Sequence, residues 1–176
     1  MVEHDLATPL AAMHSEAFGW AVHCCGGEAG LAEDVLQAAY AKVLRDRVQP
    51  AGGAALKTWW FGVVRLTAFE EMRRVRRQRS GLVKFIRHLF GDTAEPEDGQ
   101  PHPAQRMELD EEAGCLRRLL AALPARQGEV LHLVFYQDLS IAEAALAMGV
   151  GLGSARQHYE RGKRRLRELF EREETR

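Results

Sequence analysis

The stretch 123–169 constrains the fold of this chain most, because its cap and turn residues stand at fixed spacings. Ser140 stands three residues before Glu143, which is the spacing of a capping box, where each side chain accepts a hydrogen bond from the other residue's backbone N–H. Gly149 is expected to end the short helix that follows, because glycine enters the left-handed conformation without a steric penalty. The sequence therefore predicts a short helix, a glycine turn and a long helix over about 153–173.

The predicted long helix is rich in side chains that can read DNA. These side chains are Arg156, Gln157, His158, Arg161, Lys163 and Arg164. Arginine and glutamine form paired hydrogen bonds with guanine and adenine in the major groove. A short helix, a tight turn and a second helix of this composition form a helix-turn-helix arrangement, so this unit is predicted to bind duplex DNA.

Charge alternates along the chain, although the whole chain has a net charge of only −1. Residues 1–40 contain six acids and no Lys or Arg, whereas 41–90 contain twelve basic and three acidic residues. Residues 91–112 contain one basic residue and eight acids, and 153–176 contain eight basic residues and five acids. Two basic zones divided by an acidic stretch predict two polyanion contacts on two modules. Solvated helix faces would explain either basic zone alone, but explain the alternation less well.

Apolar residues at helical spacing predict a nearly all-α chain in two small domains. In the first domain, 1–90, helices are expected over about 6–24, 29–46 and 54–79, and Gly81 is expected to separate off a short amphipathic piece, Leu82–Phe90. Residues 91–107 are rich in Pro, Gly and acids and predict a linker. The second domain, 108–176, contains the helix-turn-helix.

A second binding signal lies in the first domain, where the aromatic residues Trp59, Trp60 and Phe61 precede a basic run. The run contains Arg73, Arg74, Arg76 and Arg77. Unpaired nucleic acid binds where bases stack on aromatic rings and guanidinium groups hold phosphates. The alternative is that the rings lie in the core and the arginines form a solvated face. Because adjacent side chains point to different faces of a helix, one of the two tryptophans is expected in the core.

Enzyme chemistry is not expected. The sequence contains no Gly-rich phosphate loop, no His/Cys metal set and no nucleophile elbow, so it predicts no cofactor, no metal and no catalytic residue. Cys24 and Cys25 beside His23 could indicate a metal or redox site, but buried small apolar residues are the favoured interpretation. The acidic N-terminus and the lack of a long apolar run predict a cytoplasmic protein without membrane insertion.

Three segments stand in an order typical of one family. The first reads Ala32-Glu33-Asp34-Val35-Leu36-Gln37, and the second reads Trp59-Trp60-Phe61-Gly62-Val63-Val64-Arg65, with Glu70, Arg73 and Arg74 after it. The third begins with Leu123-Pro124-Ala125-Arg126 and contains Leu139-Ser140, Gly149-Val150 and Gly153-Ser154. In this order they resemble the motifs of the bacterial sigma-70 family, in particular its extracytoplasmic-function (ECF) group, over about 8–80 and 110–172.

The resemblance implies a non-enzymatic subunit that binds core RNA polymerase and directs promoter-specific initiation. It implies that the polymerase clamp helices bind Glu33, Asp34 and Gln37. It implies that the melted minus-ten element binds Trp59, Arg65, Glu70, Arg73, Arg74, Arg76 and Arg77. It implies that the duplex minus-thirty-five element binds Ser154, Arg156, Gln157, His158, Arg161, Lys163 and Arg164. The acidic linker would run through polymerase channels that normally hold nucleic acid.

Departures from the family pattern leave alternatives open. Leu66 stands in place of an asparagine, and Ala38 stands in place of a glutamate. The acidic Glu160 lies among the basic residues of the predicted recognition helix. One alternative is a helix-turn-helix regulator that binds duplex DNA without polymerase, and another is a decoy that binds an anti-sigma protein without initiating transcription. The resemblance also implies an anti-sigma protein or another regulatory partner, for which the segment 82–90 is a candidate docking surface.

Overall fold

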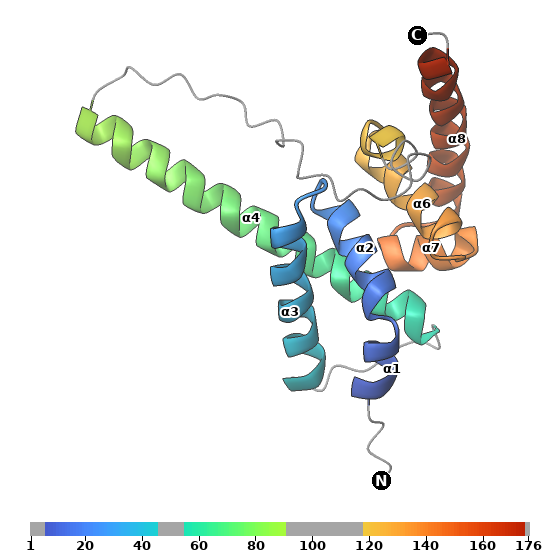
Figure 1. The fold of residues 1–176 in the computed structure, drawn as a ribbon, viewed down its shortest axis with the longest axis horizontal. Helices are drawn as coiled ribbons and strands as arrows, with labels where there is room; N and C mark the ends of the chain where they lie inside the picture. The colour runs from blue at the N-terminus through green and yellow to red at the C-terminus, as the bar shows by residue number, and fades with distance from the viewer. Residues whose placement is uncertain (1–5, 46–54, 91–117, 175–176) are drawn as a thin grey trace.

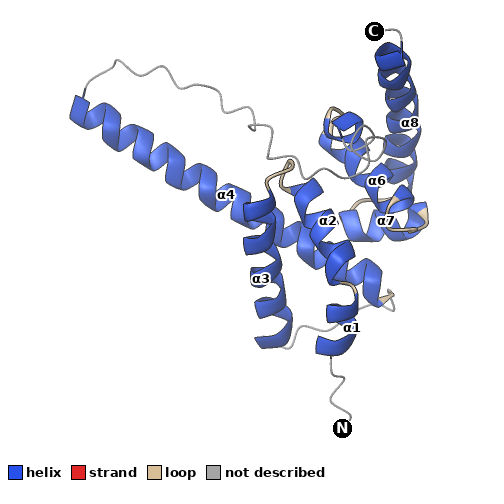
Figure 2. Cartoon of the chain, viewed as in Figure 1, coloured by secondary structure: helices blue, strands red, loops and turns tan. Residues whose placement is uncertain are grey.

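The chain is built from helices (Figures 1 and 2). The computed structural model describes residues 6–45, 55–90 and 118–174. The elements are α1 (Ala7–Ala12), α2 (His14–Cys24), α3 (Ala29–Arg45), α4 (Leu56–Phe90), α6 (Ala125–Phe135), α7 (Ile141–Met148) and α8 (Leu152–Glu174). No strand occurs within the three described ranges, so the predicted all-α fold is confirmed.

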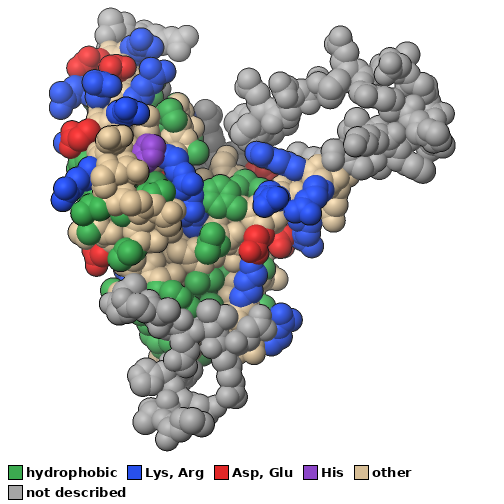
Figure 3. Space-filling model, turned by 180° about the vertical axis from the view of Figure 1, so that it is seen from behind, with side chains coloured by type: hydrophobic (Ala, Val, Ile, Leu, Met, Phe, Trp, Pro, Cys, Tyr) green, Lys and Arg blue, Asp and Glu red, His purple; other side chains and the backbone are tan. Residues whose placement is uncertain are grey.

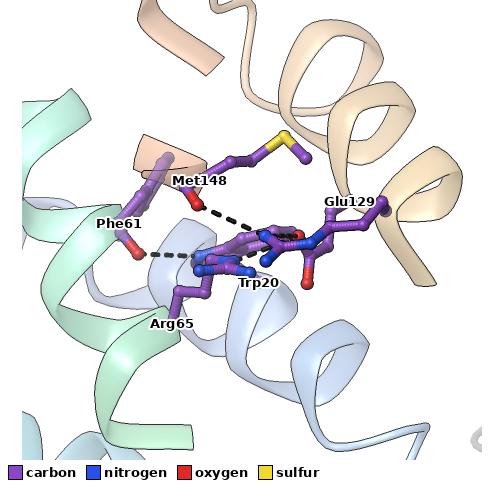
Figure 4. Close-up of polar contacts among 6 residues, drawn as sticks. Trp20, Phe61, Arg65, Glu129 and Met148 are labelled. Carbon is purple, nitrogen blue, oxygen red and sulfur yellow. Dashed lines mark hydrogen bonds and ion pairs between the residues drawn. The ribbon is translucent and has the colours of Figure 1, made fainter. Parts of the chain in front are cut away.

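In the first domain, α2, α3 and α4 pack around a core that contains two fully buried tryptophans, Trp20 and Trp60. The Trp20 indole N–H donates a hydrogen bond to the Phe61 carbonyl at 3.0 Å, which ties α2 to α4 (Figure 4). The helix expected over 6–24 is interrupted at Met13, where φ is −95° and ψ is 10°, and it therefore forms α1 and α2.

The long helix α4 runs from the aromatic segment through the basic run without a break. The expectation that Gly81 ends this helix was wrong, because the helix continues to Phe90 (Figure 1). A single glycine weakens a helix by about 1 kcal/mol relative to alanine but does not forbid its continuation. The segment 82–90 is therefore an extension of α4, and its side chains lie outside the described residues.

In the second domain, α6, α7 and α8 form the predicted helix-turn-helix. The Glu143 backbone N–H donates to Ser140 Oγ at 3.2 Å, and the Ser140 backbone N–H donates to Glu143 Oε2 at 2.8 Å, so the capping box is confirmed. Gly149 ends α7 with φ 64° and ψ 38°, as predicted. The predicted linker 91–107, the start of the second domain at 108–117 and Cys115 lie outside the described residues.

The two domains pack directly on each other, with α7 against α4 and α6 against α2 (Figure 1). The backbones of α4 and α7 approach closely at Gly62, where an added Cβ would lie 3.5 Å from the Ala147 carbonyl oxygen. Leu131, Leu133 and Met148 of the second domain belong to the same apolar cluster as the core of the first domain. No sequence pattern predicted this contact.

Candidate nucleic-acid interface

The predicted recognition helix, α8, has one packed face and one basic face. Ala155 and Gly162 are buried, and a Cβ added at Gly162 would lie 3.0 Å from Leu131 Cδ1, so α8 lies close against α6 here. The opposite face exposes Ser154, Arg156, Gln157, Arg161, Lys163 and Arg164, and His158 is half-buried. Figure 3 shows Lys and Arg side chains gathered over this end of the molecule. The predicted major-groove residues therefore lie together on one helix.

The polar contacts of α8 leave several of these side chains available to a ligand. Within the described part of the chain, Arg156, Gln157 and Arg161 have no hydrogen-bond or ion-pair partner on other side chains. The Lys163 ammonium lies 5.1 Å from the centre of the Tyr159 ring. Glu160 lines a surface hollow together with Arg161, Lys163, Arg164 and Arg167, so this acid stands among basic residues.

The second basic surface lies along α4. Arg73, Arg74, Arg76 and Arg77 are all exposed. Trp60 is fully buried and packs on Tyr40 with ring centres 4.9 Å apart, whereas Trp59 is half-buried. The expectation that one tryptophan belongs to the core is confirmed. Glu70 is exposed and forms an ion pair with Lys42 of α3, so it braces two helices of the first domain.

Arg65 lies apart from the other predicted DNA-binding residues. It is only 4% exposed, and its Nε lies 3.0 Å from Glu129 Oε2 of the second domain (Figure 4). Arg126 approaches the same carboxylate at 3.4 Å and donates a hydrogen bond to the Met148 carbonyl at 3.3 Å. In this arrangement the Arg65 guanidinium faces protein rather than solvent. Sequence reasoning missed Glu129, although an acid beside Val130 on the apolar face of a helix is a signal for a buried partner.

The exposed face of α3 carries the residues predicted to bind polymerase. Glu33, Asp34 and Gln37 are all exposed, whereas Val35 and Leu36 between them are buried. Residues three and four apart are neighbours on a helix surface, so the two carboxylates and the amide form one polar patch.

Four aromatic rings stack where α2 meets α6, and sequence reasoning also missed this cluster. The centres of the His23 and His132 rings are 4.7 Å apart, and Trp20 and Tyr136 stack on them at 5.1–5.6 Å. Burial lowers the pKa of His23 to about 4, and burial with the neighbouring His23 lowers the pKa of His132 to about 3. Both imidazoles are therefore neutral at pH 7.

The adjacent cysteines next to this cluster are free thiols. Burial raises the pKa of Cys25 to about 12 and raises that of Cys24 well above its ordinary value, so neither is an activated thiolate at neutral pH. No group of three or more His, Cys, Asp or Glu side chains that could hold a metal occurs among the described residues. The favoured interpretation of these cysteines as packed apolar residues agrees with their surroundings.

No helix within the described ranges is both long enough and apolar enough to span a bilayer.

Comparisons with known proteins agree with the order of the motifs. The family described as Sigma-70, region 4 matches residues 113–166, which contain the helix-turn-helix. The RNA polymerase sigma factor SigZ of Bacillus subtilis (strain 168) is 24% identical over 141 residues, covering 80% of this chain and 73% of SigZ. The fold is similar to that of the sigma factor RpoE in its complex with the anti-sigma factor NepR from Bartonella quintana, with a TM-score of 0.63, 24% identity, and coverage of 95% of this chain and 97% of that chain. The helix-turn-helix segment therefore matches region 4 of the sigma-70 family, and the fold over nearly the whole chain is similar to that of a sigma factor.

Proposed function

We propose that this protein binds bacterial core RNA polymerase and directs initiation at promoters that carry two separate recognition elements. One observation carries the proposal: within the segment that matches region 4, α8 presents Arg156, Gln157 and Arg161 to solvent on one face and packs its other face on α6. This is the geometry of a recognition helix that enters a major groove.

The exposed residues of α8, α4 and α3 are assigned to the two promoter elements and to polymerase. The duplex minus-thirty-five element binds the basic face of α8, and the melted minus-ten element binds the half-buried Trp59 and the exposed arginines 73, 74, 76 and 77 of α4. The polar patch of α3 binds the polymerase clamp. The domains extend over 1–90 and 108–176, and the acidic segment 91–107 joins them. The protein acts in the cytoplasm, without a cofactor and without catalysing a reaction.

We also propose an anti-sigma protein as a regulatory partner. The solved relative RpoE was crystallised with the anti-sigma factor NepR, and that fold is shared over nearly all of this chain. In this chain, Leu66 and Leu146 are exposed by 60% and 64% on the two domains. Large apolar side chains exposed to this degree are suited to burial by a protein partner.

Run-off transcription tests the proposed function. The full chain is mixed with bacterial core enzyme and a promoter library, and the start sites are mapped. Initiation from a shared pair of upstream motifs is the expected result. Arg156→Ala should weaken recognition of the minus-thirty-five motif by about 5- to 150-fold, because one paired contact to a base contributes about 1–3 kcal/mol.

Arg172→Ala is the matched control, because Arg172 is an exposed arginine on the same helix but lies in its last turn. It should leave motif recognition unchanged. Binding to duplex DNA without binding to core enzyme would instead indicate a regulator that works without polymerase. Binding to core enzyme without initiation would indicate a decoy.

A further inference from the structure

The contact between the two domains contains a buried charge pair. Arg65 of α4 and Glu129 of α6 are each 4% exposed, and their ion pair joins residues of different domains. Arg126 supplies a second positive charge to the Glu129 carboxylate. A buried ion pair gains little net stability, because the attraction between the charges is offset by the loss of their hydration. Separation of the domains returns both charges to water, so this contact is suited to opening and closing.

Two histidines also belong to the contact between the domains. His23 lies on α2 and His132 on α6, so their ring stack also joins the two domains. The chain is shaped for this stack at Gly128, where an added Cβ would lie 3.2 Å from the His23 ring. Gln137 lies 3.3 Å from His132 Nε2 and donates to the Glu16 carbonyl at 3.4 Å, which adds another polar link between the domains.

The charged groups near the two histidines do not stabilise a state in which both rings are protonated. Cys24 follows His23 on α2, and Arg65 of α4 and Glu129 of α6 are its electrostatic neighbours, with Arg126 beside Glu129. The Glu129 carboxylate is already shared by the two guanidinium groups. Two imidazolium rings with centres 4.7 Å apart would repel each other in a site that lacks a free carboxylate among the described residues.

We propose that the interdomain contact is a proton-gated clasp, in which neutral His23 and His132 hold the domains together and their protonation separates them and exposes Arg65. In the closed arrangement α7 covers part of α4, and Arg65 is withheld from nucleic acid. After the domains separate, each domain can contact its own DNA element. This consequence rests on the proposed function. The clasp itself concerns only the shape of the free protein.

The sign of the pH effect follows from linkage. Both histidines have a pKa below 6.5 in the closed state, so the open state binds more protons and gains population as the pH falls below 6.5. If both return to their ordinary pKa on opening, each shifts the equilibrium by about 30-fold between pH 7.5 and pH 5.0, and together they shift it by about 1000-fold.

Small-angle X-ray scattering of the unlabelled full chain tests the clasp. The radius of gyration should be small at pH 7.5 and should increase between pH 6.5 and pH 5.0, while far-UV circular dichroism shows that the helices persist. A radius that stays constant over this range, with the helices intact, would overturn the proposal. Because no polymerase or DNA is present, this result is independent of whether the protein is an active sigma factor.

Substitution of the histidines tests whether their protonation causes the domains to separate. The double variant His23→Phe/His132→Phe keeps the aromatic stack without a titratable group, so it should stay compact at pH 5.0. If this variant expands at the same pH as the wild type, acid acts on another group, such as Glu129, and the proposal fails. His14→Phe is the matched control, because His14 is an exposed histidine on α2 that contacts Tyr40 of the same domain. This variant should open as the wild type does.

Two further variants keep the test decisive. Glu129→Gln removes the carboxylate from the charge pair and should expand the chain already at pH 7.5. If the double phenylalanine variant does not fold, His132→Gln removes one titratable ring and should reduce the pH-dependent shift in the opening equilibrium from about 1000-fold to about 30-fold. An unchanged pH response in His132→Gln would contradict the clasp.

Discussion

Arg65 Nε and Glu129 Oε2 lie 3.0 Å apart in a buried site, although 64 positions separate the two residues in the chain. A charge left alone in such a site loses its hydration without gaining a partner, whereas an apolar pair of similar volume avoids this penalty. The stability of the interdomain contact should therefore depend on the two residues jointly rather than on each residue separately.

A double-mutant cycle on this pair measures that coupling. Glu129→Leu should destabilise the protein by about 3–5 kcal/mol, because it leaves the buried Arg65 charge unpaired. Arg65→Met should destabilise it less, because Arg126 still approaches the Glu129 carboxylate at 3.4 Å. The double variant should be much less destabilised than the sum of the single variants. Urea unfolding followed by circular dichroism gives the free energies. Additive effects in the cycle would show that the two side chains do not interact in solution.

The capping box of α7 should contribute measurably to the helix-turn-helix. Ser140→Ala should destabilise the second domain by about 1 kcal/mol, whereas Ser140→Gly should cost only a few tenths. Hydrogen bonds from the Ser140 hydroxyl and backbone lower the pKa of Glu143, so the stabilisation is present above the ordinary Glu pKa and is lost as the pH falls through the lowered value. Unfolding by urea at pH 7 and at low pH checks both effects, and equal losses at the two pH values would contradict this account.

Two glycines of α8 should respond oppositely to substitution by alanine. Gly162→Ala should destabilise the second domain by about 1–3 kcal/mol, because the new Cβ would lie 3.0 Å from Leu131 Cδ1 and 3.3 Å from the Gln127 carbonyl oxygen. Gly153→Ala meets no atom within 4 Å and should stabilise α8 by up to about 1 kcal/mol. Thermal unfolding of the two variants side by side is the measurement. A stabilised Gly162→Ala variant would show that α8 does not pack on α6 as closely as described.

Charge reversal on α3 should weaken binding to polymerase without changing the affinity for DNA. Glu33→Lys and Asp34→Lys change exposed residues whose neighbours Val35 and Leu36 form the core, so the fold should be retained. Each variant should bind core polymerase at least about tenfold more weakly, because like charges across an interface are strongly unfavourable. Affinity for duplex DNA should not change, since α8 supplies that surface. Core binding equal to that of the wild type would remove α3 from the proposed interface.

Local rules determined most of the secondary structure. The capping box of Ser140 and Glu143, the left-handed Gly149 and the basic face of α8 follow from spacings within a few residues, and the structure has all of them. The order of the motifs also indicated a resemblance to the sigma-70 family, and the region 4 match over 113–166 agrees with it. Local rules failed at Gly81, because an isolated glycine only weakens a helix, and the continuation of α4 depends on the summed preference of its neighbours.

Tertiary structure alone decided which of the similar residues are available to a ligand. Trp59 and Trp60 are adjacent and chemically identical, yet only Trp60 lies fully in the core. Arg65 belongs to the same basic helix as the exposed Arg73, but it is buried because α6 brings Glu129 to it. The sequence by itself determined the helices, their caps and the charge of their faces, since these depend on neighbours along the chain. The packing of α6 and α7 on α2 and α4 decided which charges meet, because burial and ion pairing depend on residues that are distant in sequence and close in space.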